Sequence, residues 1–529
     1  MALKSTYNFA PLNEKVFCPE WKGDVSQDIP FENGEDGTIT FNITNVSPLY
    51  VRDKDKNDPK PAHIKIGDKY RFFIPATSIK GMLRSVMEVF TFARMTQNPD
   101  NNEKFSYRNI RRQDYRTAAG EVECGWLYKD KQDGKYKVDL CCEQFEKILI
   151  EALPKRPVGD SSYDRNKSLG WYPEYNSGRE KYNIVCTGKM RNKRHEYLFP
   201  TETYEPDVLD DKFMAEFKRT YKNTDGFEEY MARLEKYERI AVFVILDKDG
   251  YIKHIGNPRY MRLPYKNSIN DLISKQQPAT SGLDLCQMIF GYADLNGKSL
   301  RGRVQITPAF TAPLGQDVIG AEIKGVLGQP KPSYYPLYLK QVRNGRNRYK
   351  TYNDADGIAG RKFYRIHSGS GAKSLPQNDG NEDVITSFKP LKPNQKFTCK
   401  INVHNMRPIE IGALLSALTL HQTPNVFHNI GLAKGFGYGK IKIKDVNLKG
   451  LSMKVEDYLA AFEEEMCYFL GADWTKCEQV TTLLQILSDH NTPDLGMMSL
   501  PEFGRFTQDN NFDTLVERAQ VNCPSFIKS

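Results

Sequence analysis

Apolar and polar residues alternate with a period of two along several short stretches of the chain, which is the pattern of strands half buried in a sheet. Two longer segments instead repeat apolar residues at helical spacing, so each is predicted to be a helix with one apolar face. In chain order the predicted elements are strand 38–46, helix 77–95, strand about 302–310, strand 396–404, helix 408–420 and strand 438–446.

This β-α-β-β-α-β order is the ferredoxin-like (RRM-like) plan, an antiparallel sheet with two helices on one face. We therefore predict an α+β fold with large insertions into such a core and a helical C-terminal tail. The predicted domains are 1–96 as the N-terminal part of the core, 97–235 as an insertion, 236–450 as the rest of the core and 451–529 as a helical extension.

Composition narrows the class of protein. The 529 residues include 75 Lys and Arg against 66 Asp and Glu, a formal charge of +9, and 12% of the residues are aromatic. This mild basic bias is compatible with nucleic acid, and the aromatic side chains could stack on bases. No window approaches eighteen apolar residues and the N-terminus has no apolar signal segment, so we expect a cytoplasmic protein without membrane contact.

The ten cysteines are scattered, without a C-x-x-C pair and without histidines at zinc-ligand spacing. We therefore predict no metal site and no disulfide framework.

A glycine-rich loop at 431–439 is the first candidate for chemistry. Its sequence is Gly-Leu-Ala-Lys-Gly-Phe-Gly-Tyr-Gly, followed by Lys440 and a basic strand. It lacks the spacing of a P-loop, and it opens no helix as a dinucleotide loop would. Two interpretations remain, a cradle for a phosphodiester backbone or an ordinary glycine-rich hairpin. The candidate RNA-binding residues here are Lys434, Gly435, Gly437, Gly439 and Lys440.

Two other basic features could contact an anion. Lys80 and Arg84 lie four residues apart at the start of the helix predicted after Pro75, whose N-terminus could bind an anion. The segment 338–367 is rich in Arg and Lys and is interpreted as a basic loop that orders on RNA, with Arg343, Arg346 and Arg348 as candidates. For both features the alternative is a solvated charged surface.

The stretches 74–84 (Ile-Pro-Ala-Thr-Ser-Ile-Lys-Gly-Met-Leu-Arg) and 431–440 together resemble the RAMP superfamily of CRISPR-associated proteins. The first looks like that family's turn into its first helix, and the second like its glycine-rich loop. Asp284–Gly291, Gly302–Val304 and Glu410–Leu415 look like the larger members found beside type III systems. The resemblance covers 5–446 loosely and does not extend to 451–529.

The resemblance implies a protein that holds CRISPR RNA by its backbone, beside other effector subunits and a complementary target RNA. In backbone subunits of type III effectors an aspartate between the first strand and first helix cleaves target RNA. Asp53, Asp55 and Asp58 fall in that loop, with Asp68 less well placed, and a divalent metal such as Mg²⁺ would be the cofactor of such cleavage. The loop is longer and more charged than the family's, and Ala76 replaces its usual glycine.

Two alternatives stay open. A processing endoribonuclease of the same superfamily would cut precursor CRISPR RNA by metal-independent acid–base chemistry, with His63, His195, His404 or His428 as candidates. A non-catalytic scaffold would contact protein partners only. Chelation distinguishes the two kinds of cleavage, because histidine chemistry should survive it and carboxylate–metal chemistry should stop.

Overall fold

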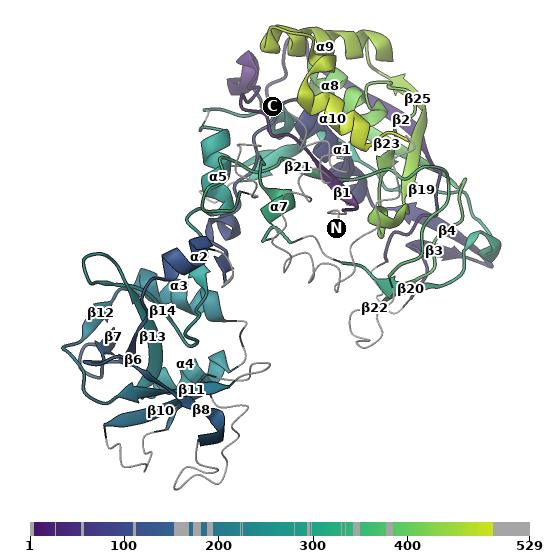
Figure 1. The fold of residues 1–529 in the computed structure, drawn as a ribbon. Coiled ribbons are helices and arrows are strands. Elements are labelled where there is room, and N and C mark those ends of the chain that lie inside the picture. The colour runs from purple at the N-terminus through teal and green to yellow at the C-terminus, as the bar shows by residue number, and fades with distance from the viewer. Residues whose placement is uncertain are drawn as a thin grey trace. The chain divides into compact units, whose positions relative to one another are not determined.

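The computed structural model describes residues 5–489 except for a set of internal gaps. These gaps are 27, 54–57, 109–112, 153–168, 173–180, 188–193, 223, 225, 280, 294–296, 298, 329–330, 334, 342–349 and 377–384. The chain divides into two compact units, the first formed by 1–102 and 267–529 and the second by 103–266. Both units mix helices with strands (Figure 1), so the predicted α+β class is confirmed.

The first unit is built on an eight-stranded sheet with the order β24-β25-β2-β23-β19-β4-β3, in which β18 also pairs with β23. The strands are β2 (Glu35–Asn45), β3 (His63–Ile66), β4 (Lys69–Ile74), β18 (Val304–Ile306), β19 (Ala309–Phe310), β23 (Lys396–Met406), β24 (His428–Asn429) and β25 (Lys440–Lys449). The pairings between them are antiparallel.

Apolar and polar residues alternate along the central strands, so one side of the sheet is apolar and buried. Ile39, Phe41 and Ile43 of β2 are buried, as are the residues from Phe397 to Val403 that alternate along β23. Helices α1 (Ala76–Phe90) and α8 (Pro408–Thr419) contribute to the same hydrophobic core. The opposite side of these strands carries polar residues, so the sheet has one apolar and one polar face.

Each predicted core element has a counterpart, with two differences. The strand expected at about 302–310 is two strands, β18 and β19, separated by Thr307 and Pro308. Pro308 lacks an N–H for the ladder, which explains the interruption. The helix expected over 77–95 ends at Phe90, and Phe92 has a positive φ of 49°.

Helix α8 is buried on every side rather than on one face. Its residues Glu410 to Leu418 are all buried. The reason is α9 (Val455–Leu470), which lies across α8 (Figure 1). A Cβ on Gly412 would lie 2.1 Å from the carbonyl oxygen of Tyr458, so only glycine permits this close approach.

The rest of the first unit surrounds this core. In the described part of the tail, which ends at Asp489, α9 is followed by α10 (Glu478–Ile486). Strand β1 (Tyr7–Ala10) pairs with β21 (Arg361–Tyr364), which joins the N-terminus to the end of the segment predicted as a basic loop. The remaining elements are α5 (Ile269–Gln276), α6 (Leu285–Phe290), α7 (Tyr335–Tyr338), β16 (Gly291–Ala293), β17 (Ser299–Arg301), β20 (Ile323–Val326) and β22 (Ile385–Phe388).

The second unit has its own sheets and cores. A five-stranded sheet has the order β12-β7-β6-β13-β14, and a four-stranded sheet has the order β8-β11-β10-β9. Its elements are β5 (Ser106–Tyr107), α2 (Gln113–Ala119), β6 (Glu123–Lys129), β7 (Tyr136–Leu140), β8 (Glu146–Leu149), β9 (Leu169–Tyr172), β10 (Tyr182–Thr187), β11 (His195–Pro200), β12 (Asp207–Leu209), α3 (Asp211–Tyr221), α4 (Phe227–Glu235), β13 (Ile240–Leu246), β14 (Ile252–Gly256) and β15 (Leu263–Pro264).

The division into units differs from the sequence-based one. The insertion was predicted over 97–235, whereas the second unit spans 103–266 and includes the hairpin β13–β14. Residues of β13 such as Val242 and Phe243 are fully buried within this unit. This hairpin therefore belongs to the second unit's core and not to the first.

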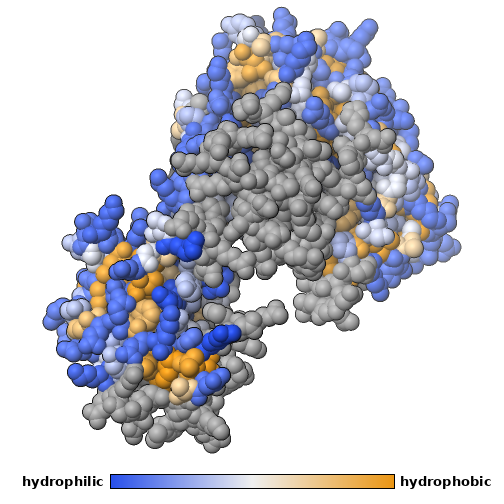
Figure 2. All heavy atoms as spheres, in the orientation of Figure 1, coloured by the Kyte–Doolittle hydropathy of each residue, from blue (hydrophilic) through white to orange (hydrophobic). Residues whose placement is uncertain are grey.

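The described surface is mostly hydrophilic on the side that Figure 2 shows, with hydrophobic patches between hydrophilic residues. In the part of the chain that the structure describes, no helix is both long and apolar enough to span a bilayer.

Candidate nucleic-acid interface

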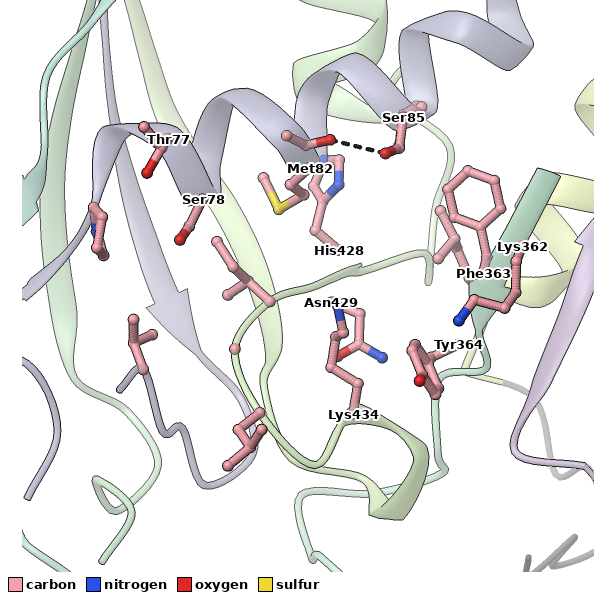
Figure 3. Close-up of a pocket in the computed structure, with 18 of the residues that line it drawn as sticks. Thr77, Ser78, Met82, Ser85, Lys362, Phe363, Tyr364, His428, Asn429 and Lys434 are labelled. Atoms are coloured by element: carbon pink, nitrogen blue, oxygen red, sulfur yellow. Dashed lines mark hydrogen bonds between the residues drawn. The ribbon is translucent and has the colours of Figure 1, made fainter. Parts of the chain in front are cut away.

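The two motifs singled out in the sequence line one groove of the first unit. The groove encloses about 600 Å³. Its walls are the first turns of α1, the segment from β24 into the glycine-rich loop, and β21 (Figure 3). Segments 75–86 and 428–434, far apart in the sequence, thus form one continuous surface.

Helix α1 contributes hydroxyl groups at its N-terminal end. Thr77, Ser78, Gly81 and Ser85 line the groove, and Figure 3 shows Thr77 and Ser78 facing the opposite loop. Thr77 and Ser78 are adjacent, and Gly81 and Ser85 follow them at spacings of three to four residues, which puts all four toward the same side of the helix. Pro75 occupies the N-cap position without a side-chain capping bond, and its carbonyl oxygen accepts a hydrogen bond from the N–H of Ser78 at 3.0 Å. The N–H groups that precede Ser78 therefore lie at the open end of the helix, beside these hydroxyls.

Three cationic residues line the groove, namely Arg52, Lys362 and Lys434. The ammonium of Lys434 lies 5.4 Å from the ring centroid of Tyr364, and that of Lys362 lies 4.9 Å from the same centroid. Neither has a carboxylate partner among the residues that the structure describes, and no acidic residue is among those described as lining the groove. Burial lowers the pKa of Lys434, and burial together with the nearby Lys434 lowers the pKa of Lys362. Among the described residues, the groove therefore carries positive charge without a carboxylate to compensate it.

Most glycines of the loop permit close packing of the loop itself, and few of them line the groove. Gly431 lines the groove with a φ of 90°, whereas a Cβ on Gly435 would meet the Thr6 hydroxyl at 2.6 Å. Gly437 lies beside His367, and a Cβ on Gly439 would lie only 1.8 Å from the Ile430 carbonyl oxygen. These close approaches explain the glycine-rich sequence, because they fold the loop tightly and place Lys434 in the groove wall.

Lys440 has a structural place, contrary to its prediction as an RNA-binding residue. Its side chain is 3% exposed, and its ammonium donates to the carbonyl oxygens of His367 and Gly369 and to Asp489 Oδ2 at 2.6 Å. A cation buried with these three acceptors is already satisfied. The Lys440 side chain therefore joins the start of β25 to residues 367–369 and to Asp489.

Lys80 and Arg84 lie on a different side of α1 from the groove. The ammonium of Lys80 donates to the carbonyl oxygen of Phe290 at 3.1 Å, and Arg84 Nε donates to Glu88 Oε1 at 3.0 Å. Neither residue lines the groove. The basic pair predicted from helical spacing is thus separated from the hydroxyls that precede it.

The aspartate loop is described only in part. Asp55 lies outside the described residues, as do Arg343, Arg346 and Arg348 of the predicted basic loop. Asp53 Oδ2 is 3.5 Å from the backbone nitrogen of His63. Burial alone would raise the pKa of Asp58, but hydrogen bonds from the backbone N–H and ammonium of Lys60 lower it.

No group of three or more His, Cys, Asp or Glu side chains within the described ranges could hold a metal ion. The residues present there, Asp53 and Asp58 included, do not form a site for the Mg²⁺ that the resemblance implies.

The four candidate histidines are spread over the molecule. His63 Nδ1 lies 2.9 Å from the Pro61 carbonyl oxygen, His404 Nδ1 lies 2.6 Å from Asp36, and His195 is in the second unit. His428 borders the groove, but it is 3% exposed and its Nε2 is 3.0 Å from the Leu418 carbonyl oxygen. Burial lowers the pKa of His428 to about 4, so it is neutral at pH 7.

Sequence reasoning missed Tyr364 and did not select Lys362 as a site residue. Lys362 belongs to the basic run that was assigned to a loop, yet it lies on β21, whose pairing with β1 fixes its position. Tyr7 and Phe9 of β1 lie on either side of the polar Asn8, which is the alternation of a strand, whereas Phe363 and Ile366 around β21 are three residues apart. That weak strand pattern was the available signal.

Comparison with known proteins gives only distant matches. No family model and no curated protein matches the chain. Among solved structures, the crystal structure of Thermofilum pendens Csc2 is 10% identical, covers 94% of this chain and 92% of that chain, and has a TM-score of 0.25. A chain of a CRISPR RNA-guided surveillance complex in a pre-nicking state is 11% identical, covers 82% and 90%, and has a TM-score of 0.22. Both scores lie well below 0.5, so neither match establishes a common fold.

Proposed function

We propose that this chain is a CRISPR-associated RNA-binding protein that holds guide RNA by its backbone in the groove between α1 and the glycine-rich loop. It would work within a type III-like effector, with other subunits and a complementary target RNA as partners. The observation that carries the proposal is the groove itself. Two of its three walls include parts of the two stretches on which the resemblance to the RAMP superfamily rests, and its lysines have no carboxylate partner among the residues that the structure describes.

The order of elements supports the structural part of the proposal. Strands β2, β18–β19, β23 and β25 with helices α1 and α8 follow the order β-α-β-β-α-β, and β2 lies between β25 and β23. We propose that these elements form a ferredoxin-like core.

The chemistry of the groove fits a sugar–phosphate backbone. Lys362 and Lys434 can neutralise phosphates, and Thr77 and Ser78 can hydrogen-bond to phosphate or ribose oxygens. The helix N-terminus favours the same negative charge. Few of these groups could distinguish one base from another, so recognition should depend on the backbone and vary little with base sequence.

Cleavage of target RNA stays a secondary proposal. Asp53 directly follows Arg52, a groove residue, so the loop predicted to carry the catalytic aspartate begins at the groove. The endoribonuclease alternative gains nothing from the described histidines, because the one at the groove is buried. Whether the purified chain carries RNA distinguishes the scaffold alternative from an RNA-binding function.

The test begins with purification of the chain from its native operon context, followed by extraction and sequencing of any bound nucleic acid. We expect short uniform RNAs with a repeat-derived end. The variant Lys362→Gln with Lys434→Gln should lose most of this RNA, whereas the control Lys15→Gln with Lys454→Gln, two exposed lysines of the same unit, should retain it. Absence of RNA from the wild-type protein, or random cellular fragments, would favour the scaffold.

A further inference from the structure

The polar side of the central sheet is a second basic surface that shares no residue with the groove. We call it the open face: the side of β2, β23 and β25 opposite the buried Ile39, Phe41 and Ile43. Cross-strand partners point to the same side, so Thr40 of β2 shares this face with Lys400 of β23 and Asn447 of β25. Thr38, Thr40, Asn42 and Thr44 form its central row.

Lysines flank that row on both sides. Five are exposed on the open face or its edge: Lys396 and Lys400 of β23, and Lys442, Lys444 and Lys449 of β25. The same three strands carry three carboxylates, of which Glu35 accepts hydrogen bonds from the hydroxyls of Ser452 and Tyr458. Asp445 accepts a 2.7 Å hydrogen bond from Asn42, which lowers its pKa, and lies 3.5 Å from Lys396. Asp36 lies 2.6 Å from His404 Nδ1. Positive charge is therefore in excess.

Aromatic rings continue the same face beyond β23. Phe310 of β19 is the cross-strand partner of Thr398, and Phe73 of β4 is the partner of Phe310. The two rings are 5.7 Å apart between centroids, and the Arg71 guanidinium lies 4.5 Å from the Phe310 centroid. Both rings are half-buried and Arg71 is exposed. One edge of the face thus offers two adjacent rings with a cation above one of them.

We propose that the open face binds single-stranded RNA, independently of the groove. The lysines would neutralise phosphates, the rows of Thr and Asn would hydrogen-bond to ribose and base edges, and Phe73 with Phe310 would stack on bases. An acidic protein could satisfy the lysines. The paired rings at the end of a flat, hydroxyl-rich surface fit unstacked bases better, because every base has a face that an aromatic ring can cover.

The test isolates the open face by using the full chain with Lys362→Gln and Lys434→Gln in the groove. Binding of a fluorescein-labelled single-stranded RNA of mixed sequence is followed by anisotropy between low and moderate salt. We expect this background to retain measurable binding. Lys400→Gln with Lys444→Gln should then weaken affinity and reduce the slope of log K against log salt by about 1.4, which is roughly 0.7 per phosphate contact.

Replacing the two rings should change RNA affinity without changing its salt dependence. Phe73→Leu with Phe310→Leu keeps apolar packing but removes the stacking surface, so affinity should fall on the order of tenfold. The salt slope should not change, because no charge is removed. Lys15→Gln with Lys454→Gln serves as the control for charge alone and should leave both affinity and slope unchanged.

A photo-crosslink between bromouridine-containing RNA and the wild-type chain gives a readout that does not depend on any variant folding. Crosslinked peptides containing Phe73 or Phe310 are expected. The proposal is overturned if the groove variant alone abolishes RNA binding, if crosslinks map only to the groove, or if open-face variants retain RNA and instead lose a co-purifying acidic protein. Loss of guide RNA from the groove variant tests the proposed function separately.

Discussion

At the scale of single residues, the groove holds two lysines that have no carboxylate partner among the residues that the structure describes. Lys362 and Lys434 share the ring of Tyr364 and are partly removed from water. Burial disfavours the ammonium form and lowers both pKa values, and the nearby Lys434 lowers the pKa of Lys362 further. An anion in the groove would reverse both effects. This arrangement costs the free protein stability and gains affinity for a phosphate.

This pair predicts a pH dependence. The folded pKa of each lysine lies below the ordinary value of about 10.5, so the ammonium forms needed for phosphate binding are lost at lower pH than for an exposed lysine. RNA affinity should therefore decline through the mildly alkaline range below pH 10.5. Lys362→Arg with Lys434→Arg should hold its affinity there, because arginine stays charged.

Anisotropy titrations at several pH values up to about 10 would measure this decline. Identical pH profiles for the wild-type and arginine variants would contradict it. The stability of the free protein should change in the opposite direction: the unfolded state binds more protons between the folded and unfolded pKa values, so the free energy of unfolding rises with pH across that interval.

At the scale of elements, one buried ion pair joins the sheet to the helix beneath it. Arg303, at the start of β18, and Glu410, in the first turn of α8, both have fully buried side chains. Arg303 Nη1 donates to Glu410 Oε2 at 2.8 Å and also to the Asn405 carbonyl oxygen, and its Nε donates to that of Met288. Glu410 in turn accepts from the backbone N–H of Arg407 at the α8 N-terminus. The network fixes α8 relative to β23 and β18.

Breaking this pair should be costly. Glu410→Gln leaves the Arg303 cation buried without its counter-charge, so we expect the free energy of unfolding to fall by about 3 kcal/mol. The double variant Arg303→Met with Glu410→Leu removes both charges and should recover much of that loss. Urea denaturation of the single and double variants measures the coupling. A double variant less stable than Glu410→Gln would show that the network stabilises by more than charge compensation.

At the scale of the whole molecule, the chain passes between the two units twice, and within each unit the two connecting segments lie next to each other. In the second unit β5 pairs with β15, and the N–H of Tyr265 donates to the carbonyl oxygen of Phe105 at 2.8 Å. In the first unit the side chain of Asn270 donates to Asn102 Oδ1 at 2.7 Å. In each unit, therefore, the two chain segments next to the boundary contact each other.

This closure predicts that the two units fold separately. Replacing 103–266 by a short Gly/Ser linker should leave the first unit folded with its groove intact, because 102 and 267 already lie in one local structure. Residues 103–266 alone should also fold. Circular dichroism and thermal melting of both products, with RNA binding of the first, provide the measurement. Aggregation of either product while the full chain stays folded would contradict independent folding.

The sequence by itself determined the elements of the core. Alternation located β2 and β23, and helical periodicity located α1 and α8, since burial of one face imposes these periods on the chain. It also selected the two stretches that line the groove. It did not anticipate that α8 would be buried all round, because the helix covering it, α9, lies more than thirty residues further along. Nor did it find the boundaries of the second unit.

Only the tertiary structure decided what the basic residues do. Lys434 in the glycine-rich loop and Lys440 at the start of β25 lie six residues apart, yet one faces the groove and the other is buried against Asp489. Lys80 and Arg84 share a helix with the groove hydroxyls and face another side. Lys362 belongs to the basic segment that was interpreted as a loop, yet it lies in strand β21. Local periodicity reports which residues are buried, but the partner of a charge is set by segments distant in sequence, and no local pattern records them.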